Sequence, residues 1–179
     1  MQGFVNFSTD IANVLSILIP LICFVVGLSC FLLAGYGAWQ MMKPGTFWSS
    51  RKYMPPLLLL FGTVLVDFNK ILNFSNNTFG GGTQTSIQTG FTPFTAPQVG
   101  GTGMMGSTPE QSFLNIITAF SAFFVAYGAF NVLLAWLGAK AVAEGKRRHG
   151  YSLPMVQFVF GIALMNIVFI SQTIMGYFT

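Results

Sequence analysis

The sequence predicts an all-α integral membrane protein made of two tandem helical hairpins, and three observations lead to this prediction. Charged residues make up only 7% of the chain and hydrophobic residues 53%, whereas soluble domains carry roughly 25% charged residues. Four apolar segments are each long enough for a bilayer core of ~30 Å. The two halves of the chain also resemble each other. The expected solvent is therefore the bilayer.

The four apolar segments are residues 11–42, 55–74, 112–139 and 154–178. Each follows a helix-start signal, namely Asp10, Pro55, Pro109 or Pro154. Pro20 is expected to kink the first helix. The N-terminal residues lack the positive charge of a secretory signal, so the first helix is expected to be retained. The first hairpin then occupies residues 1–74 and the second 111–179.

Residues 75–110 connect the hairpins and differ in composition from both. This segment is rich in Gly, Thr and Pro, and Glu110 is its only charged residue. It shows no apolar periodicity, which predicts a loop without regular structure. A connection of this length is uncommon and is typically functional or disordered.

An internal repeat supports the division into two hairpins. Residues 36–39, Tyr-Gly-Ala-Trp, recur as Tyr-Gly-Ala-Phe at residues 127–130, which is 91 residues later. A second match, at an offset of 99 residues, covers five positions of the second helices. They are Pro55, Phe61, Gly62, Leu65 and Asp67, matched by Pro154, Phe160, Gly161, Leu164 and Asn166. The difference predicts eight extra residues in the second hairpin loop. Repeats with an even number of helices are parallel, so both hairpin loops are expected on one side.

Basic residues concentrate in these two loops. The clusters are Lys43, Arg51 and Lys52 in the first loop and Lys140, Lys146, Arg147 and Arg148 around the second. The positive-inside rule places both loops in the cytoplasm, with the termini and the long loop opposite. Three interpretations stay open: topology signals that also contact anionic lipid, the lining of a conduit for nucleic acid or protein, and a docking site for a cytoplasmic partner.

Small residues recur at helix-packing spacing in the first and third segments. They are Gly27, Cys30, Ala34 and Ala38 in the first segment and Ala122, Ala126 and Ala129 in the third. Small side chains let helices approach closely in lipid, where van der Waals packing drives association. These residues are expected to pack either within a hairpin or between subunits.

The sequence offers little for catalysis. His149 is the only histidine, and no motif has metal-ligand or phosphate-loop spacing. We therefore expect no enzymatic activity, no metal and no cofactor apart from bound phospholipid. Asp67 and Lys70 are the only opposite charges within an apolar segment, and they can pair at i, i+3. A structural pair near the interface is expected, with an ion pathway as the alternative.

A hydrophobic helix, a short basic loop and a second hydrophobic helix form the plan of conjugative pilins. This plan occurs twice here. In length, four-segment layout and long central loop, the chain resembles the small polytopic membrane proteins of type IVB secretion and IncI-type conjugation systems (TraQ, DotE/IcmC type). A doubled hairpin departs from two-helix pilins, which leaves open whether the chain is a filament subunit or a component of the base.

This resemblance implies a pilin-like subunit that assembles by helix packing into a pilus or translocation channel. The implied partners are other copies of the chain, phospholipid, further secretion-system membrane subunits and transferred DNA or protein. The seven basic loop residues would face the lumen or the lipid headgroups. The implied location is the bacterial inner membrane, with extrusion as a surface pilus. The alternatives are a small four-helix transporter or channel, or a membrane scaffold at the base of the machine.

Overall fold

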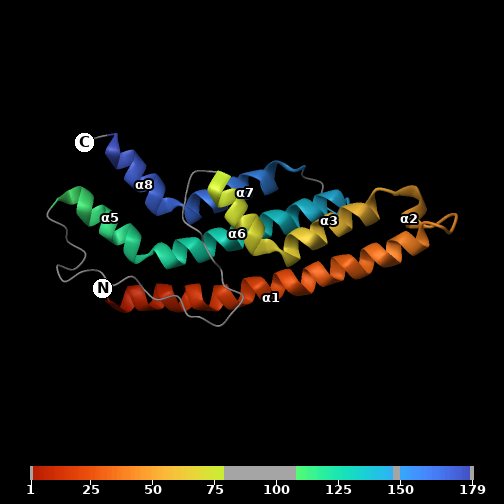
Figure 1. Cartoon of the computed structure of the whole chain (residues 1–179), viewed down its shortest axis with the longest axis horizontal. Helices are drawn as coiled ribbons and strands as arrows, with labels where there is room; N and C mark the ends of the chain where they lie inside the picture. The colour runs from red at the N-terminus through yellow and green to blue at the C-terminus, as the bar shows by residue number, and fades with distance from the viewer. Residues whose placement is uncertain (1, 79–107, 147–149, 178–179) are drawn as a thin grey trace.

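A computed structural model describes residues 2–78, 108–146 and 150–177 (Figure 1). Within these ranges the chain forms eight α-helices and no strand, which confirms the predicted all-α class. The helices are α1 (Gln2–Gln40), α2 (Phe47–Ser50), α3 (Met54–Val66), α4 (Phe68–Thr78), α5 (Pro109–Ala119), α6 (Ser121–Ala143), α7 (Ser152–Met165) and α8 (Ile167–Gly176). Most of the predicted 75–110 loop lies outside the described residues, although α4 extends to Thr78.

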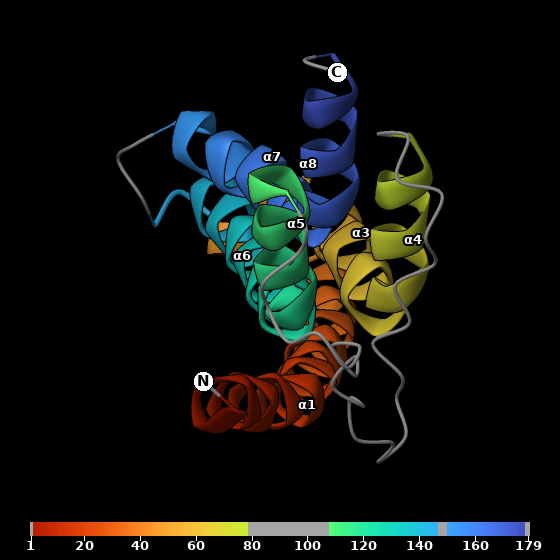
Figure 2. The same ribbon diagram turned by 90° about the vertical axis from the view of Figure 1, so that its left-hand side faces the viewer.

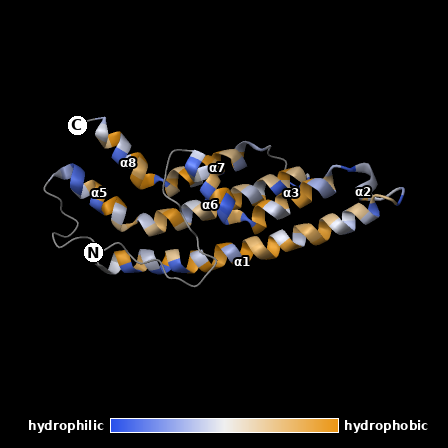
Figure 3. Cartoon of the chain, viewed as in Figure 1, coloured by the Kyte–Doolittle hydropathy of each residue, from blue (hydrophilic) through white to orange (hydrophobic). Residues whose placement is uncertain are grey.

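Two of these helices are long and apolar enough to cross a membrane, over Val5–Gln40 and Ser121–Ala143. Two further pairs qualify together but are bent: α3 with α4 by 79°, and α7 with α8 by 72°. The described part of the chain therefore holds two to four candidate spans, those of an integral membrane protein. Many large apolar side chains of the long helices are exposed, and Figure 3 shows that these helices are apolar over much of their length. Such exposure is expected when the solvent is lipid rather than water.

The helices form two antiparallel hairpins that lie side by side (Figures 1 and 2). Within the hairpins, α1 packs along α3 and α6 packs along α7; between them, α1 packs against α6. Both α1 and α6 run toward the hairpin loops in the same direction (Figure 1), as parallel repeats require. Beyond the bends, α5 and α8 also contact each other.

Each hairpin is closed by two facing glycines. A Cβ added to Gly27 would lie 3.3 Å from the carbonyl oxygen of Gly62, and one added to Gly128 would lie 2.6 Å from that of Gly161. Because glycine has no side chain, the two backbones can approach this closely. The second hairpin is the tighter of the two, since its glycines meet backbone at a distance no real Cβ occupies.

These crossings correct the register of the repeat. Gly62 and Gly161 are 99 residues apart, as predicted, but the glycines facing them, Gly27 and Gly128, are 101 residues apart rather than 91. At 101 residues, six residues of α1 match α6: Gly27, Leu32, Leu33, Ala34, Gly37 and Ala38 match Gly128, Leu133, Leu134, Ala135, Gly138 and Ala139. The Tyr-Gly-Ala match was a coincidence of composition. The second loop is two residues shorter than the first, not eight longer.

The second helix of each hairpin breaks at the same repeat position. Asp67 ends α3 and Asn166 ends α7, and these two residues are 99 apart. The predicted helices 55–74 and 154–178 are therefore each two helices. The third predicted helix is also divided, at Phe120. Pro20 does not divide the first helix, because α1 continues through this proline.

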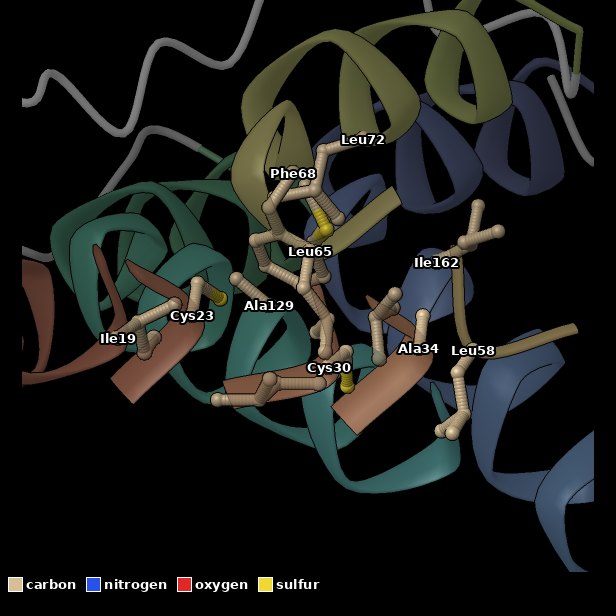
Figure 4. Packing of buried hydrophobic residues seen from close by; sticks show 13 residues of the cluster. Ile19, Cys23, Cys30, Ala34, Leu58, Leu65, Phe68, Leu72, Ala129 and Ile162 are labelled. Carbon is tan, nitrogen blue, oxygen red and sulfur yellow. The ribbon is translucent and has the colours of Figure 1, made fainter. Parts of the chain in front are cut away.

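The core is a narrow seam between the helices, shown close up in Figure 4. It joins Cys23 of α1, Leu65 of α3, Ala129 of α6 and Ile162 of α7 in one cluster. The buried positions of α1 over this stretch are residues 23, 27, 30, 34 and 37. Their alternating spacing of four and three is the knobs-into-holes pattern of neighbouring antiparallel helices.

Six of the seven predicted packing residues lie in this seam or in its extension. Gly27, Cys30, Ala34, Ala122, Ala126 and Ala129 are buried. Ala38 is exposed, so it does not pack within its hairpin. The i, i+4, i+8 rule drifts around the helix after Ala34, and Gly37 takes the next position against the partner helix instead.

Candidate functional site

The two basic loops meet at one end of the bundle, and each is shaped by a glycine. In the first loop, α2 is capped by Thr46, whose hydroxyl accepts from the backbone N–H of Ser49 at 3.3 Å. The Trp48 ring folds back over α1, where a Cβ on Gly37 would lie 2.6 Å from it. Gly37 therefore provides the space that lets the loop return across the helix end.

The second loop begins where α6 ends. Gly145 has φ +74°, a conformation that favours glycine, and the following Lys146 N–H donates to the Ala141 carbonyl at 2.9 Å. These contacts form the usual glycine-based C-terminal cap of a helix. The carboxylate of Glu144 then accepts from two lysines, Lys140 at 2.9 Å and Lys146 at 2.6 Å.

Arg51 connects the loops. Its Nη1 donates to the backbone carbonyl oxygen of Glu144 at 3.2 Å, across 93 residues of sequence. The same guanidinium lies over Gly145, 3.2 Å from where a Cβ would be. We call this contact the loop clasp. The clasp places the two basic loops at the same end of the molecule. The repeat predicts both loops on one side, and they do lie together.

Glu144 is the acidic centre of the clasp, with a side chain only 10% exposed. Burial alone raises the pKa of this carboxyl group, but hydrogen bonds from Lys146 and Lys140 and the charges of both lysines outweigh burial, so its pKa is lowered. Glu144 is therefore ionised at neutral pH, and its single negative charge is shared by two of the loop lysines. Sequence reasoning missed this residue because its lysines lie four residues before it and two after it, an ordinary pattern at a helix end.

Aromatic rings lie against two of the other loop cations, Lys43 and Arg51. Lys43 is exposed and lies 3.9 Å from the Trp39 ring centroid, and Arg51 lies 4.7 Å from that of Phe47. Lys52 is exposed as well. Aromatic rings under cations at this depth are typical of a membrane–water interface. Arg147, Arg148 and His149 lie outside the described residues.

An apolar groove of about 420 Å³ opens beside the second loop, between α6 and α7. Its lining includes Trp136, Tyr151, Pro154, Met155 and Phe158. The Trp136 ring meets Phe61 and Phe158 edge to face, at centroid distances of 6.0 and 6.3 Å. Its indole nitrogen is buried without a hydrogen-bond partner.

Asp67 and Lys70 form the predicted ion pair at 3.1 Å, at the opposite end of α3 from the clasp. Their side chains are 49% and 79% exposed. The pair lies where α3 ends and α4 turns away, and the second repeat has Asn166 in place of Asp67. This geometry is that of a surface pair at a helix bend, since a buried relay would need low exposure and a second titratable group.

Among the described residues, no group of three or more His, Cys, Asp or Glu side chains could hold a metal ion. No family model, curated protein or solved structure matches the chain. The described molecule is thus a small all-helical membrane protein whose most concentrated chemistry is the pair of clasped basic loops.

Proposed function

We propose that this chain is a pilin-like membrane subunit of a conjugative or type IV secretion apparatus. It assembles by helix packing into a pilus or translocation channel for DNA or protein. The observation that carries the proposal is the loop clasp between two parallel hairpins. The clasp gathers five basic residues at one end of the molecule: Lys43, Arg51, Lys52, Lys140 and Lys146. Two hairpins that only cross a membrane side by side would not need a contact between their loops.

Charge favours a polyanionic or anionic-lipid partner for this end. Glu144 offsets one of the two positive charges of its own lysines, while Lys43 and Lys52 are exposed without an ion-pair partner among the described residues. In an assembly of many subunits, such side chains would form a positive surface for DNA phosphates or for lipid headgroups. The apolar groove beside Trp136 is within the size range of ligand pockets and suits a phospholipid acyl chain.

Location follows from the same charges. The basic end is proposed to face the cytoplasm, with the chain in the bacterial inner membrane before extrusion as a surface pilus. The other proposed partners are further copies of the chain and neighbouring membrane subunits of the apparatus.

The test combines a clean deletion with a search for filaments. Deletion should abolish transfer of DNA or protein to recipient cells, and a plasmid-borne copy should restore it. Surface filaments sheared from complemented cells should yield peptides of this chain. Filaments without it would favour a scaffold at the base, and normal transfer in the deletion strain would refute both versions.

The alternative of a transporter or channel depends on Asp67 and Lys70. Their exposure at the end of α3 favours a surface role over an ion pathway. Replacing both by apolar residues should leave transfer and assembly unchanged. Loss of an ion or solute flux in this double variant, with normal assembly, would support the transporter instead.

A further inference from the structure

The repeat at its corrected register identifies equivalent packing surfaces on the two hairpins. Four residues of α6 face hairpin 1, and all are buried: Ala122 is 7% exposed, Ala126 1%, Ala129 0% and Leu133 1%. Ala122 and Ala126 pack in one cluster with Ala12 of α1, and Ala129 and Leu133 share the main cluster with Cys23. Their spacing of four, three and four makes one continuous stripe. We call this stripe the receiving face of hairpin 2.

Hairpin 1 carries the same stripe, which is exposed in the described part of the chain. The residues 101 positions earlier are Leu21, Val25, Leu28 and Leu32, which are 58%, 54%, 47% and 69% exposed. They follow the same spacing and lie on the side of α1 away from α3. Among the described residues, hairpin 1 therefore has an exposed receiving face of aliphatic side chains.

The complementary surface is also present twice. Hairpin 1 sits on hairpin 2 through a ridge on α1 formed by Ala12, Leu15, Ile19, Ile22 and Val26. Ala12 and Ile19 are fully buried there. Within one chain, this ridge packs on the receiving face of hairpin 2.

The residues 101 positions later form the corresponding ridge on hairpin 2, which spans the break between α5 and α6: Phe113, Ile116, Phe120, Phe123 and Tyr127. Phe113, Ile116 and Tyr127 are 51%, 43% and 42% exposed. The rings of Phe123 and Tyr127 stack at a centroid distance of 5.8 Å, which gives the ridge a preformed aromatic surface. Hairpin 2 therefore presents a ridge and hairpin 1 a receiving face, and neither has a partner within the described chain.

We propose that a second copy of this chain places the aromatic ridge of its hairpin 2 on the receiving face of hairpin 1. The contact continues, between chains, the hairpin-on-hairpin packing already present within the chain. This inference rests on the proposed function, because it names the surface through which the subunit assembles. The ridge and the face are different surfaces, so the contact is heterologous and each added copy offers a new free face.

The internal contact also indicates that the assembly stays open. Ala12 packs with Ala122 and Ala126, whose repeat counterparts Leu21 and Val25 lie nine and 13 residues beyond Ala12. Neighbouring hairpins are thus displaced along the helix axis by about 14–20 Å at ~1.5 Å per residue. A rotation combined with such a displacement is a screw operation, which builds a filament and does not close into a ring.

Disulfide cross-linking between two differently tagged chains tests the contact. One chain carries Val25→Cys and the other Ile116→Cys; these positions correspond to Ala126 and Leu15, which pack together within the chain. Oxidation of membranes from cells that express both chains should give a dimer that carries both tags. Ala12→Cys with Ala126→Cys in one chain is the positive control for the internal contact.

Leu60→Cys is the matched control for Val25→Cys. Leu60 lies on α3, is also 54% exposed and precedes Gly62, which faces Gly27 of α1. Paired with Ile116→Cys, it should cross-link several-fold less than Val25→Cys. Equal yields for Val25 and Leu60 would mean that both positions face lipid, which overturns the proposed contact.

The outcomes separate this inference from the proposed function. Filaments that contain the chain, without the Val25–Ile116 cross-link, would refute the docking surface and leave the function standing. A specific cross-link combined with normal transfer after deletion would support the surface and refute the function.

Discussion

The two hairpins of this chain share a plan but differ in the continuity of their first helix. In hairpin 1, α1 continues through Pro20 although proline removes a helical hydrogen bond. In hairpin 2, the helix breaks at Phe120, with Ser121 at the position of the proline. The neighbouring position in hairpin 1, Ile19, is 0% exposed because hairpin 2 packs over it. Phe120 is only half-buried, so the helix continues at the fully covered position and breaks at the less covered one.

Substitutions at the glycine crossings should change the stability of the protein most, and they should affect the two hairpins differently. Gly128→Ala should destabilise the protein by about 1–3 kcal/mol, because the new Cβ would meet the Gly161 carbonyl oxygen at 2.6 Å. Gly27→Ala should destabilise it less, since its shortest contact is a movable side-chain carbon of Val66 at 2.9 Å. Thermal unfolding in detergent measures both.

Gly35→Ala is the control for these two variants. A Cβ there has no atom within 4 Å, and alanine favours the helix by up to about 1 kcal/mol. This variant should be neutral or slightly stabilised. If Gly27→Ala and Gly128→Ala lowered the melting temperature equally, the second crossing would not be the tighter one.

The loops provide a second comparison, because each contains one glycine with positive φ. Gly45 has φ +82° with nothing within 4 Å, and Gly145 has φ +74° with Arg51 over it. Alanine at either position should cost about 1–2 kcal/mol of backbone strain. Gly145→Ala should cost about 1 kcal/mol more, because it also displaces the Arg51 hydrogen bond.

Arg51→Ala isolates that additional part. In the Arg51→Ala background, the two alanine variants should become equally destabilising, as a double-mutant cycle of melting temperatures would show. A difference that persisted without Arg51 would mean that the clasp does not couple the loops.

Glu144 predicts a pH dependence that only the second loop possesses. Because its pKa is lowered in the folded state, its contribution is present at neutral pH and is lost as pH falls through the folded-state pKa. Glu144→Gln should lower stability at pH 7 by about 1 kcal/mol, since Lys146 is exposed to solvent and screened. It should also flatten the melting profile below about pH 5.

Glu110→Gln is the control for this profile, because Glu110 lies exposed in the first turn of α5, far along the chain from the clasp. Its melting profile should keep the acid-induced decrease of the unmodified protein. The same flattening in both variants would assign the pH dependence to general charge rather than to Glu144.

The comparison also shows what sequence could and could not predict. Composition and apolar length predicted the all-α membrane class, and small residues predicted six of seven seam positions, because burial in lipid depends on side-chain size. The helix breaks at Asp67, Phe120 and Asn166 were missed, since apolar residues continue on both sides of each. The clasp was missed because Arg51 and Glu144 become neighbours only when the hairpins pack.

The smallest effect is expected at the other acidic residue that pairs with a lysine. Asp67 and Lys70 lie 3.1 Å apart, but both are far more exposed than Glu144, and exposed pairs contribute about 0–1 kcal/mol at most. Asp67→Asn, which introduces the residue found at the equivalent position of the second repeat, should change the melting temperature by less than any variant above. Salt should remove even this difference, because screening weakens solvent-exposed pairs first. A melting decrease as large as that of Glu144→Gln would mean that the bend between α3 and α4 depends on the carboxylate, and that the two repeats hold their equivalent bends by different means.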